Sequence, residues 1–340
     1  MRRHERCLGS APVIQQGIFV VSLDLELYWG VRDKFSLDYY KDNLLGARII
    51  IPRLLRLFEK YDIHATWATV GFLFFDCRED LLRACPNLRP IYANQALCPY
   101  RDLSSIGNDE QEDPFHFAPS LIREIASFPD QEIASHTFSH YYCLEPGQTK
   151  ETFRADLDAA LAAAAMWQIK LKSIIFPKNQ CNSDYFDVCR EREIIAYRGA
   201  ETFWFAQPDV APHKRAVRLL DWYLPISGHN CYEPGRLATA PLVNIPSSRF
   251  LRFHALTRFD RRLLLNRILS DLSFAARHGL IYHLWWHPHN LGRWREESVV
   301  FLTAIFDHVT KLRKQYGMVS LNMSEFGAAL AGRATASAGR

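Results

Sequence analysis

The chain has 340 residues, of which 48% are hydrophobic and 23% are charged. This balance is typical of globular proteins that bury a sizeable core. The 41 basic and 37 acidic residues give a formal net charge of +4 and are scattered along the chain, which argues against a dedicated surface for nucleic acid or membranes.

The sequence offers no clear targeting or membrane-spanning segment. Residues 1–6 are basic, as at the start of a secretory signal peptide, but residues 7–16 contain no sustained apolar segment. The most apolar helical segment, 159–167, is far shorter than the roughly 20 residues of a membrane span. Eight cysteines without a Cys-x-x-Cys pair favour reduced thiols over disulfides or a structural zinc site. We therefore expect a cytoplasmic protein without a transmembrane segment or a nucleic-acid partner, and the sequence predicts no particular oligomeric state.

Strand-like and helix-like segments alternate along the chain. Buried or alternating apolar patterns predict strands at residues 17–27, 64–71, 132–135, 173–176, 194–197, 280–286 and 318–321. Apolar residues at helical spacing predict helices at residues 43–61, 149–167, 185–192, 261–277 and 297–314. Residues 199–252 are irregular and rich in proline, which predicts an elaborated loop region over a site.

This alternation predicts an α/β fold. About seven βα units without a second domain favour a single-domain (β/α) barrel with about seven parallel strands. A doubly wound open sheet is the alternative, but no Gly-x-Gly-x-x-Gly follows any predicted strand. We expect the barrel to span residues 17–331, between disordered tails at residues 1–16 and 332–340.

Two carboxylates follow one another at the end of the first predicted strand. Strand alternation puts Ser22, Asp24 and Glu26 on one face and the intervening leucines on the other. The carboxyl ends of barrel strands form the catalytic rim. A salt-bridged structural pair explains an Asp-x-Glu pattern equally well.

Two histidines follow the predicted strand 132–135. His136 and His140 are four residues apart, so in one helical turn they face the same way and can share a metal. An arbitrary pair with this spacing is more often satisfied by local hydrogen bonds. The position of this pair at a strand end, however, brings it to the same rim as the carboxylates.

Three further strand ends carry polar side chains: Lys178 and Asn179 after the fourth strand, Arg198 after the fifth, and His287 and His289 after residues 280–286. Each alone could be structural. Five strand ends that all finish in carboxylate, imidazole, amide or cationic groups are hard to explain by packing, so the combination predicts an active site.

The sequence resembles the polysaccharide deacetylases of the NodB-homology type (carbohydrate esterase family 4), and more closely a branch found with bacterial surface-polysaccharide genes. The resemblance runs from about Gly17 to Ser324, and its most specific part is the histidine block. The blocks that carry it are Ser-Leu-Asp-Leu-Glu-Leu-Tyr-Trp-Gly (22–30), His-Ala-Thr-Trp-Ala-Thr-Val-Gly (64–71), Ser-His-Thr-Phe-Ser-His (135–140), Phe-Pro-Lys-Asn-Gln (176–180), Tyr-Arg-Gly (197–199) and His-Leu-Trp-Trp-His-Pro-His-Asn (283–290).

The resemblance implies a carbohydrate N-deacetylase on a distorted (β/α) barrel. Such an enzyme removes the N-acetyl group of an acetamido sugar, in a polysaccharide or linked to a nucleotide or a lipid, and releases acetate. By this resemblance Asp24 is the general base, and Glu26, His136 and His140 hold a divalent metal, for which zinc is the expectation.

Two positions depart from the family pattern. The family has adjacent aspartates, whereas Leu25 separates Asp24 from Glu26, so the ligand role of Glu26 rests on strand alternation. In the closer branch we expect arginine where Lys178 stands. Lysine is a point charge rather than a planar fork, so a carboxylate is positioned differently there.

Three histidines compete for the role of general acid. Alternation puts His283, Trp285 and His287 on one strand face, with His283 roughly 13 Å deeper at about 3.3 Å per residue. We therefore predict His283 as a buried partner, His287 as the acid and His289 as the second choice. By the family resemblance Trp285 lines the acetyl pocket. The further residues predicted to bind substrate are Lys178, Asn179, Arg198 and His289.

Two other functions compete with the deacetylase. A glycoside hydrolase could use Asp24 and Glu26 as an acid/base pair, which leaves His136 and His140 without a role. A non-catalytic sugar-binding barrel would result if the two departures had disabled the site.

Overall fold

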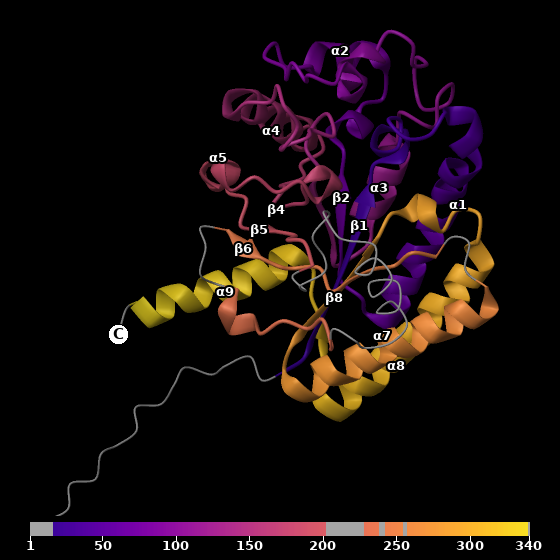
Figure 1. The fold of residues 1–340 in the computed structure, drawn as a ribbon, viewed down its shortest axis with the longest axis vertical. Helices are drawn as coiled ribbons and strands as arrows, with labels where there is room; N and C mark the ends of the chain where they lie inside the picture. The colour runs from indigo at the N-terminus through magenta and orange to yellow at the C-terminus, as the bar shows by residue number, and fades with distance from the viewer. Residues whose placement is uncertain (1–15, 202–227, 238–241, 254–256, 339–340) are drawn as a thin grey trace, which may run out of the picture.

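The structure is a computed structural model, and it describes residues 16–201, 228–237, 242–253 and 257–338. A curled sheet runs through the centre of the molecule, with helices around it (Figure 1). The predicted tail at residues 1–16 lies, apart from Gln16, outside the described residues. Much of the predicted loop region at residues 199–252 also lies outside them.

The sheet has nine strands in the described chain, and all of its pairings are parallel. Eight strands follow one another in the order β6-β5-β4-β3-β2-β1-β8-β7, and β9 pairs with β1. The strands are β1 (Ile18–Leu25), β2 (Ala65–Thr69), β3 (Gln131–Ser135), β4 (Ser173–Ile174), β5 (Ala196–Tyr197), β6 (Val243–Asn244), β7 (Arg249–Phe250), β8 (Ile281–Trp286) and β9 (Val319–Ser320). The distorted barrel is thus confirmed. The predicted number of strands was too low because β6 and β7 lie in the proline-rich region 199–252, which the sequence predicts to be irregular.

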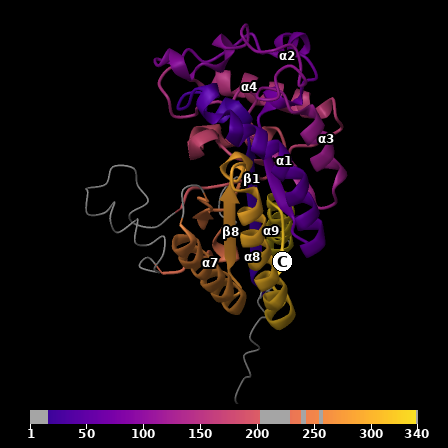
Figure 2. The same ribbon diagram turned by 90° about the vertical axis from the view of Figure 1, so that its right-hand side faces the viewer.

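Helices connect the strands and cover the outside of the sheet. The helices of the described chain are α1 (Leu37–Tyr61), α2 (Arg78–Ala84), α3 (Pro119–Ser127), α4 (Lys150–Ala165), α5 (Phe186–Glu191), α7 (Arg258–His278), α8 (Arg295–Tyr316) and α9 (Met323–Ala338). Figure 2 shows α1, α7 and α8 beside the sheet. The five predicted helices correspond to α1, α4, α5, α7 and α8.

The last helix, α9, ends at Ala338 and so extends into residues 332–340, for which the sequence predicts a disordered tail. Met323, Phe326 and Leu330 of this helix are buried in an apolar cluster. Burial of these side chains favours an ordered helix, since it removes apolar surface from water.

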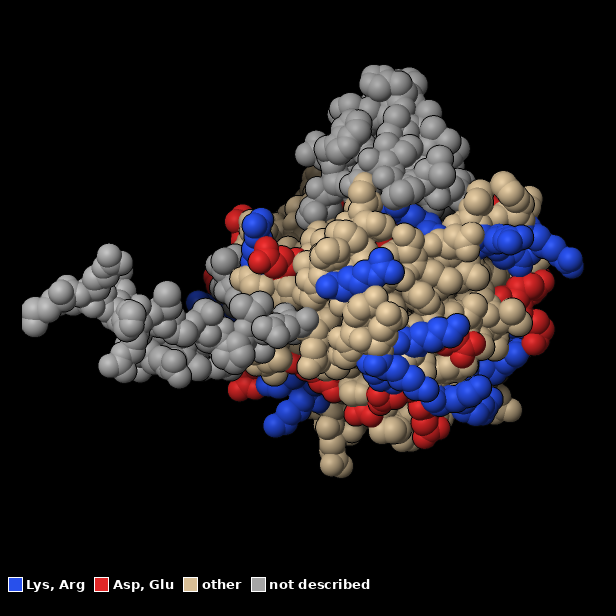
Figure 3. Space-filling view, turned by 90° about the horizontal axis from the view of Figure 1, so that it is seen from below, with Lys and Arg blue, Asp and Glu red and all other residues tan. Residues whose placement is uncertain are grey.

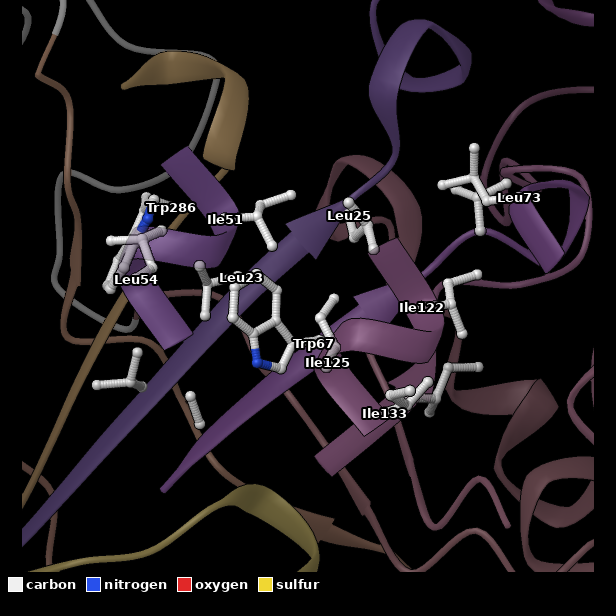
Figure 4. Close-up of a cluster of buried hydrophobic side chains, with 14 of the residues drawn as sticks. Leu23, Leu25, Ile51, Leu54, Trp67, Leu73, Ile122, Ile125, Ile133 and Trp286 are labelled. Atoms are coloured by element: carbon white, nitrogen blue, oxygen red, sulfur yellow. The ribbon is translucent and has the colours of Figure 1, made fainter. Parts of the chain in front are cut away.

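The two faces of β1 belong to different parts of the core. Leu23 and Leu25 point to the outer layer, where they pack with Ile51 and Leu54 of α1 and with Trp67 of β2 (Figure 4). This layer joins the sheet to the helices, and the side chains that form it are almost fully buried.

The opposite face of β1 points into the barrel. Ile18 and Val20 lie there in one apolar cluster with Phe326 of α9. The next inward residues along the strand are Ser22 and Asp24, which are buried but polar. The inside of the barrel therefore changes from apolar to polar toward the carboxyl ends of the strands.

The face of the molecule in Figure 3 carries charges of both signs. Lys and Arg side chains and Asp and Glu side chains are scattered over its described part. None of the described helices is long and apolar enough to cross a membrane. The cysteines in the described ranges carry free thiols.

Candidate active site

The register of β1 brings its polar residues between two neighbouring strands. Asp24 pairs with Ala68 of β2, and Ser22 pairs with Trp285 of β8. Glu26 follows β1 and precedes the short 3-10 helix η1 (Leu27–Gly30). A Cβ atom on Gly30 would lie 1.9 Å from the carboxyl carbon of Glu26, so only glycine leaves room for this carboxylate.

Asp24 is held by a buried arginine. The guanidinium of Arg198, which follows β5, donates to both Asp24 oxygens at 2.7 Å each. It also donates to Ser22 Oγ at 3.1 Å and to Asn179 Oδ1 at 3.0 Å, and it lies 3.9 Å from the centroid of the Trp285 ring. Burial raises the pKa of Asp24, but the charge and hydrogen bonds of Arg198, together with the charges of His136 and His287, outweigh burial, so the pKa lies below its ordinary value. Asp24 is therefore ionised and fixed in orientation.

Glu26 lies among four imidazole rings. Its Oε2 is 3.2 Å from His140 Nε2 and 3.3 Å from His136 Nε2. Its Oε1 is 3.5 Å from His287 Nε2 and 3.9 Å from His289 Nε2. Burial raises the pKa of Glu26, but the surrounding histidines outweigh burial and hold the pKa well below its ordinary value.

The hydrogen bonding of His136 shows whether these residues fit a metal. Its Nδ1 lies 2.8 Å from the carbonyl oxygen of Ile175, so in the neutral ring Nδ1 carries the proton and Nε2 keeps its lone pair. That Nε2 is buried without a hydrogen-bond partner among the described residues, and it faces a carboxylate oxygen. Two acceptors that face each other in a buried place call for a cation between them. The donor atoms of Glu26, His136 and His140 lie within 4.8 Å of one another, so the set fits a divalent metal.

The segment that joins the two histidines is irregular, so the predicted helical turn is wrong. Thr137 and His140 have φ of 61° and 57°, in the left-handed region that favours glycine. Asp156 of α4 compensates, because its carboxylate accepts from the backbone N–H groups of Phe138 at 2.7 Å and Ser139 at 3.2 Å. Both imidazoles reach Glu26 through this bent segment rather than through helical spacing.

Lys178 does not contact Asp24. Its ammonium group forms an ion pair with Asp33 and lies 4.6 Å from the centroid of the Tyr142 ring. Lys178 has a φ of 54°, and the next residue, Asn179, accepts a hydrogen bond from Arg198. Arg198 therefore supplies the planar cation that orients the carboxylate.

The end of β8 carries the remaining histidines. His287 Nδ1 is 3.0 Å from Asn290 Oδ1 in the short helix η8 (Pro288–Asn290), and its Nε2 is 3.7 Å from Asp24 Oδ2. The rings of His287 and His289 stack with centroids 4.9 Å apart. Trp285 packs on Phe250 with ring centroids 4.5 Å apart.

A cavity of about 590 Å³ opens over these groups. Eight of the ten predicted site residues line it: Asp24, Glu26, His140, Lys178, Asn179, Trp285, His287 and His289. The other two, His136 and Arg198, lie behind Glu26 and Asp24 and contact them. All ten therefore come together at one end of the barrel.

Sequence reasoning did not assign three residues that support the site. Asp33 pairs with Lys178, Asn290 holds His287, and Asp156 holds the histidine segment. A signal existed for Asp156, because it lies on the apolar side of its helix beside Phe153 and Leu157. Burial raises the pKa of Asp156 to about 6.

Comparison with protein families is consistent with this fold. Residues 45–194 match the family model described as polysaccharide deacetylase. Over these residues the resemblance found in the sequence is confirmed at the level of the family. Comparison with curated proteins gave no match.

Solved structures with the same fold include a candidate polysaccharide deacetylase from Mycobacterium smegmatis, with 14% identity over 96% of this chain and 93% of that chain and a TM-score of 0.59. Another from Pseudomonas aeruginosa has 10% identity over 94% of this chain and 93% of that chain, with a TM-score of 0.56. A 4-alpha-glucanotransferase from Thermococcus litoralis, with 12% identity over 92% of this chain and 40% of that chain, has a TM-score of 0.52. At such identities the likeness concerns the fold.

The buried His283 should make the stability of the protein depend on pH. Its ring lies 2.8 Å from Ser22 Oγ and 3.1 Å from the Ile245 carbonyl oxygen, and burial lowers its pKa from 6.5 to about 3. Between these values the unfolded chain binds a proton that the folded protein does not. As the pH decreases below 6.5, His283 should therefore lower the free energy of unfolding by about 1.4 kcal/mol per pH unit.

The measurement is urea unfolding between pH 7 and pH 4 with a chelator present, since metal binding adds its own pH dependence. In the His283→Gln variant the free energy of unfolding should lose this part of its dependence on pH. The control is His278→Gln, which changes an exposed histidine and should keep that dependence. Equal slopes in wild type and His283→Gln would show that His283 is protonated in the folded protein.

Proposed function

We propose that this protein is a metal-dependent deacetylase that hydrolyses the N-acetyl group of an acetamido sugar and releases acetate. The observation that carries this proposal is the arrangement of Glu26, His136 and His140, whose donor atoms converge beside the Arg198-bound Asp24 under an open cavity. The match of residues 45–194 to the polysaccharide deacetylase family model supports it.

Glu26, His136 and His140 would hold the metal. One carboxylate and two imidazoles are a ligand set typical of catalytic zinc, which keeps a position open for water or substrate. A bound divalent ion of this kind supplies a Lewis acid that polarises the acetyl carbonyl and lowers the pKa of water. The carbonyl oxygen of Ile175 orients the His136 ring by accepting its Nδ1 proton.

Asp24 would act as the general base. Each of its oxygens accepts one bond from Arg198, which leaves further acceptor capacity toward the cavity because a carboxylate offers about four lone-pair sites. The ionised state that Arg198 favours is the state that can take a proton from the attacking water.

His287 would act as the general acid. Asn290 Oδ1 accepts from Nδ1, so Nε2 is the atom that faces the carboxylates and the cavity. A proton carried on Nε2 can pass to the departing amine nitrogen of the sugar. Trp285, packed between Arg198 and Phe250, would form an apolar wall for the acetyl methyl group.

The glycoside hydrolase alternative has less support from the electrostatics. Hydrolysis of a glycosidic bond by two carboxylates needs one of them to be protonated, which requires a raised pKa. The pKa values of Asp24 and Glu26 are both lowered. Neither carboxylate is therefore suited to be a general acid.

The experiment that tests the proposal is an acetate-release assay over acetamido sugars, combined with metal analysis of the purified protein. We expect acetate release that stops when a chelator removes the metal and returns with zinc. Release of reducing ends without acetate would contradict the proposal and favour the hydrolase.

The metal ligands are tested by His136→Ala and His140→Ala. Each should lower the metal content from about one per chain toward zero and abolish acetate release, while circular dichroism shows an intact fold, since these residues lie on the rim. His64→Ala is the matched control, because Asp62, His64 and Asp130 form another group of close donor atoms. Loss of the metal in the control, but not in the site variants, would overturn the assignment.

The acid is tested by comparing His287→Gln with His289→Gln. The first should lower kcat by a factor of about 10² or more with the metal retained, because the proton donor is lost. The second should have a much smaller effect, since His289 Nε2 is farther from Glu26 than His287 Nε2 is. A larger decrease of kcat in His289→Gln than in His287→Gln would identify His289 as the general acid instead.

A further inference from the structure

The cavity has two zones of different chemistry. Its inner zone is formed by buried side chains, chiefly Asp24, Glu26 and His140. Its outer zone is formed by exposed side chains that the proposed deacetylation does not use: Lys34, Phe35, Tyr39, Arg293 and Trp294. The outer zone therefore needs an explanation of its own.

Exposed aromatic side chains concentrate at this opening. In the described chain the exposed Phe, Tyr and Trp side chains are Phe35, Tyr39, Phe259 and Trp294, and only Phe259 does not line the cavity. Phe35 stacks on Tyr40 with centroids 4.8 Å apart and planes 4° apart. Exposed apolar area that gathers at a cavity is typical of a ligand-binding surface.

The segment that carries these rings is firmly attached. Tyr28 donates its hydroxyl hydrogen to the Phe35 carbonyl oxygen at 3.0 Å, and Arg32 pairs with Asp102 at 2.7 Å. Between them Asp33 forms its ion pair with Lys178. The ion pair of Lys178 thus connects the aromatic segment to the end of β4, and a ring platform that is ordered before binding loses less entropy when a ligand stacks on it.

Two cations accompany the aromatic rings. Lys34 Nζ has no carboxylate within 4.0 Å among the described residues, and Arg293 has only the exposed Asp42 at 3.3 Å. Solvent-exposed pairs of this kind are weak. The outer zone therefore attracts anions, in contrast to the inner zone with its two carboxylates.

We infer that the substrate is an acetamido sugar attached to a phosphoryl group, with a ring or an apolar chain beyond it. This inference rests on the proposed function. Lys34 and Arg293 bind the phosphoryl oxygens, for which ammonium and guanidinium groups are suited. Phe35, Tyr39 and Trp294 contact the part beyond the phosphate, as aromatic rings do with nucleobases and other flat or apolar groups.

Calorimetric titration of the metal-loaded protein tests this inference through binding rather than turnover. The ligands are uridine diphosphate N-acetylglucosamine, N-acetylglucosamine 1-phosphate, a prenyl-diphosphate-linked N-acetylglucosamine and the neutral disaccharide N,N′-diacetylchitobiose. We expect each phosphorylated ligand to bind about tenfold or more tightly than the neutral disaccharide, with an affinity that falls as salt is added.

Variants separate the charges from the rings. Lys34→Gln and Arg293→Gln should each reduce the preference for the phosphorylated ligands about three- to tenfold, and Lys41→Gln, which removes an exposed cation outside the cavity, should not. Phe35→Leu should weaken the uridine or the prenyl conjugate more than the 1-phosphate. Whichever conjugate binds more tightly identifies the source of the phosphoryl group.

Equal affinity for the neutral and phosphorylated ligands would overturn the inference. It would also be overturned if Lys41→Gln reduced the preference for phosphorylated ligands as much as Lys34→Gln does. Acetate release is measured separately with the same ligands. Selective binding without acetate release would contradict the proposed function alone, and release from the disaccharide without any phosphate preference would contradict this inference alone.

Discussion

Two carboxylates are buried side by side on one face of β1, and the site depends on how their charges are compensated. A buried ionised carboxylate without a partner is costly, so Asp24 and Glu26 each require positive charge or hydrogen-bond donors. Arg198 meets this need for Asp24 with two bonds of 2.7 Å. Among the described residues the ion-pair partners of Glu26 are imidazoles, and in its neutral form His136, whose Nδ1 donates to Ile175, offers Glu26 a lone pair rather than a proton. The proposed metal would supply the missing positive charge. The same ion would therefore compensate the charge of Glu26 and take part in catalysis.

The barrel stabilises these buried polar groups because each of them is held by a separate helix or strand. The inward face of β1 is apolar at Ile18 and Val20, where α9 closes the barrel, and it becomes polar only near the carboxyl ends of the strands. Asp156 of α4 holds the strained histidine segment through two backbone N–H groups. Strain of this kind persists where surrounding contacts determine the backbone, and it is common at functional sites. The fold thus positions the histidines by packing and hydrogen bonds from outside the site.

Sequence patterns predicted seven of the nine described strands and the location of the site, whereas β6, β7 and the side-chain pairings depended on three-dimensional structure. β1, β2 and β8 have clear apolar patterns, but β6 and β7 have two residues each and carry no periodicity. All ten site residues were expected at strand ends, because parallel strands present their carboxyl ends on one rim. Which cation binds Asp24 could not be predicted, since Lys178 and Arg198 both follow strands whose carboxyl ends meet at the same rim. The exposed rings at Phe35 and Tyr39 had no sequence signal, because aromatic residues are more often part of the core.

The central claim is that Asp24 accepts a proton while Glu26, His136 and His140 hold a metal. The most direct measurement is acetate release by the Asp24→Asn variant together with its metal content. An amide cannot accept the proton at neutral pH, so we predict a metal content equal to that of the wild type and a rate lowered by a factor of about 10² to 10⁴. Arg198 keeps its bonds to Ser22 and Asn179 in this variant, and circular dichroism checks that the fold persists. A rate near that of the wild type, or loss of the metal with Asp24, would contradict the account.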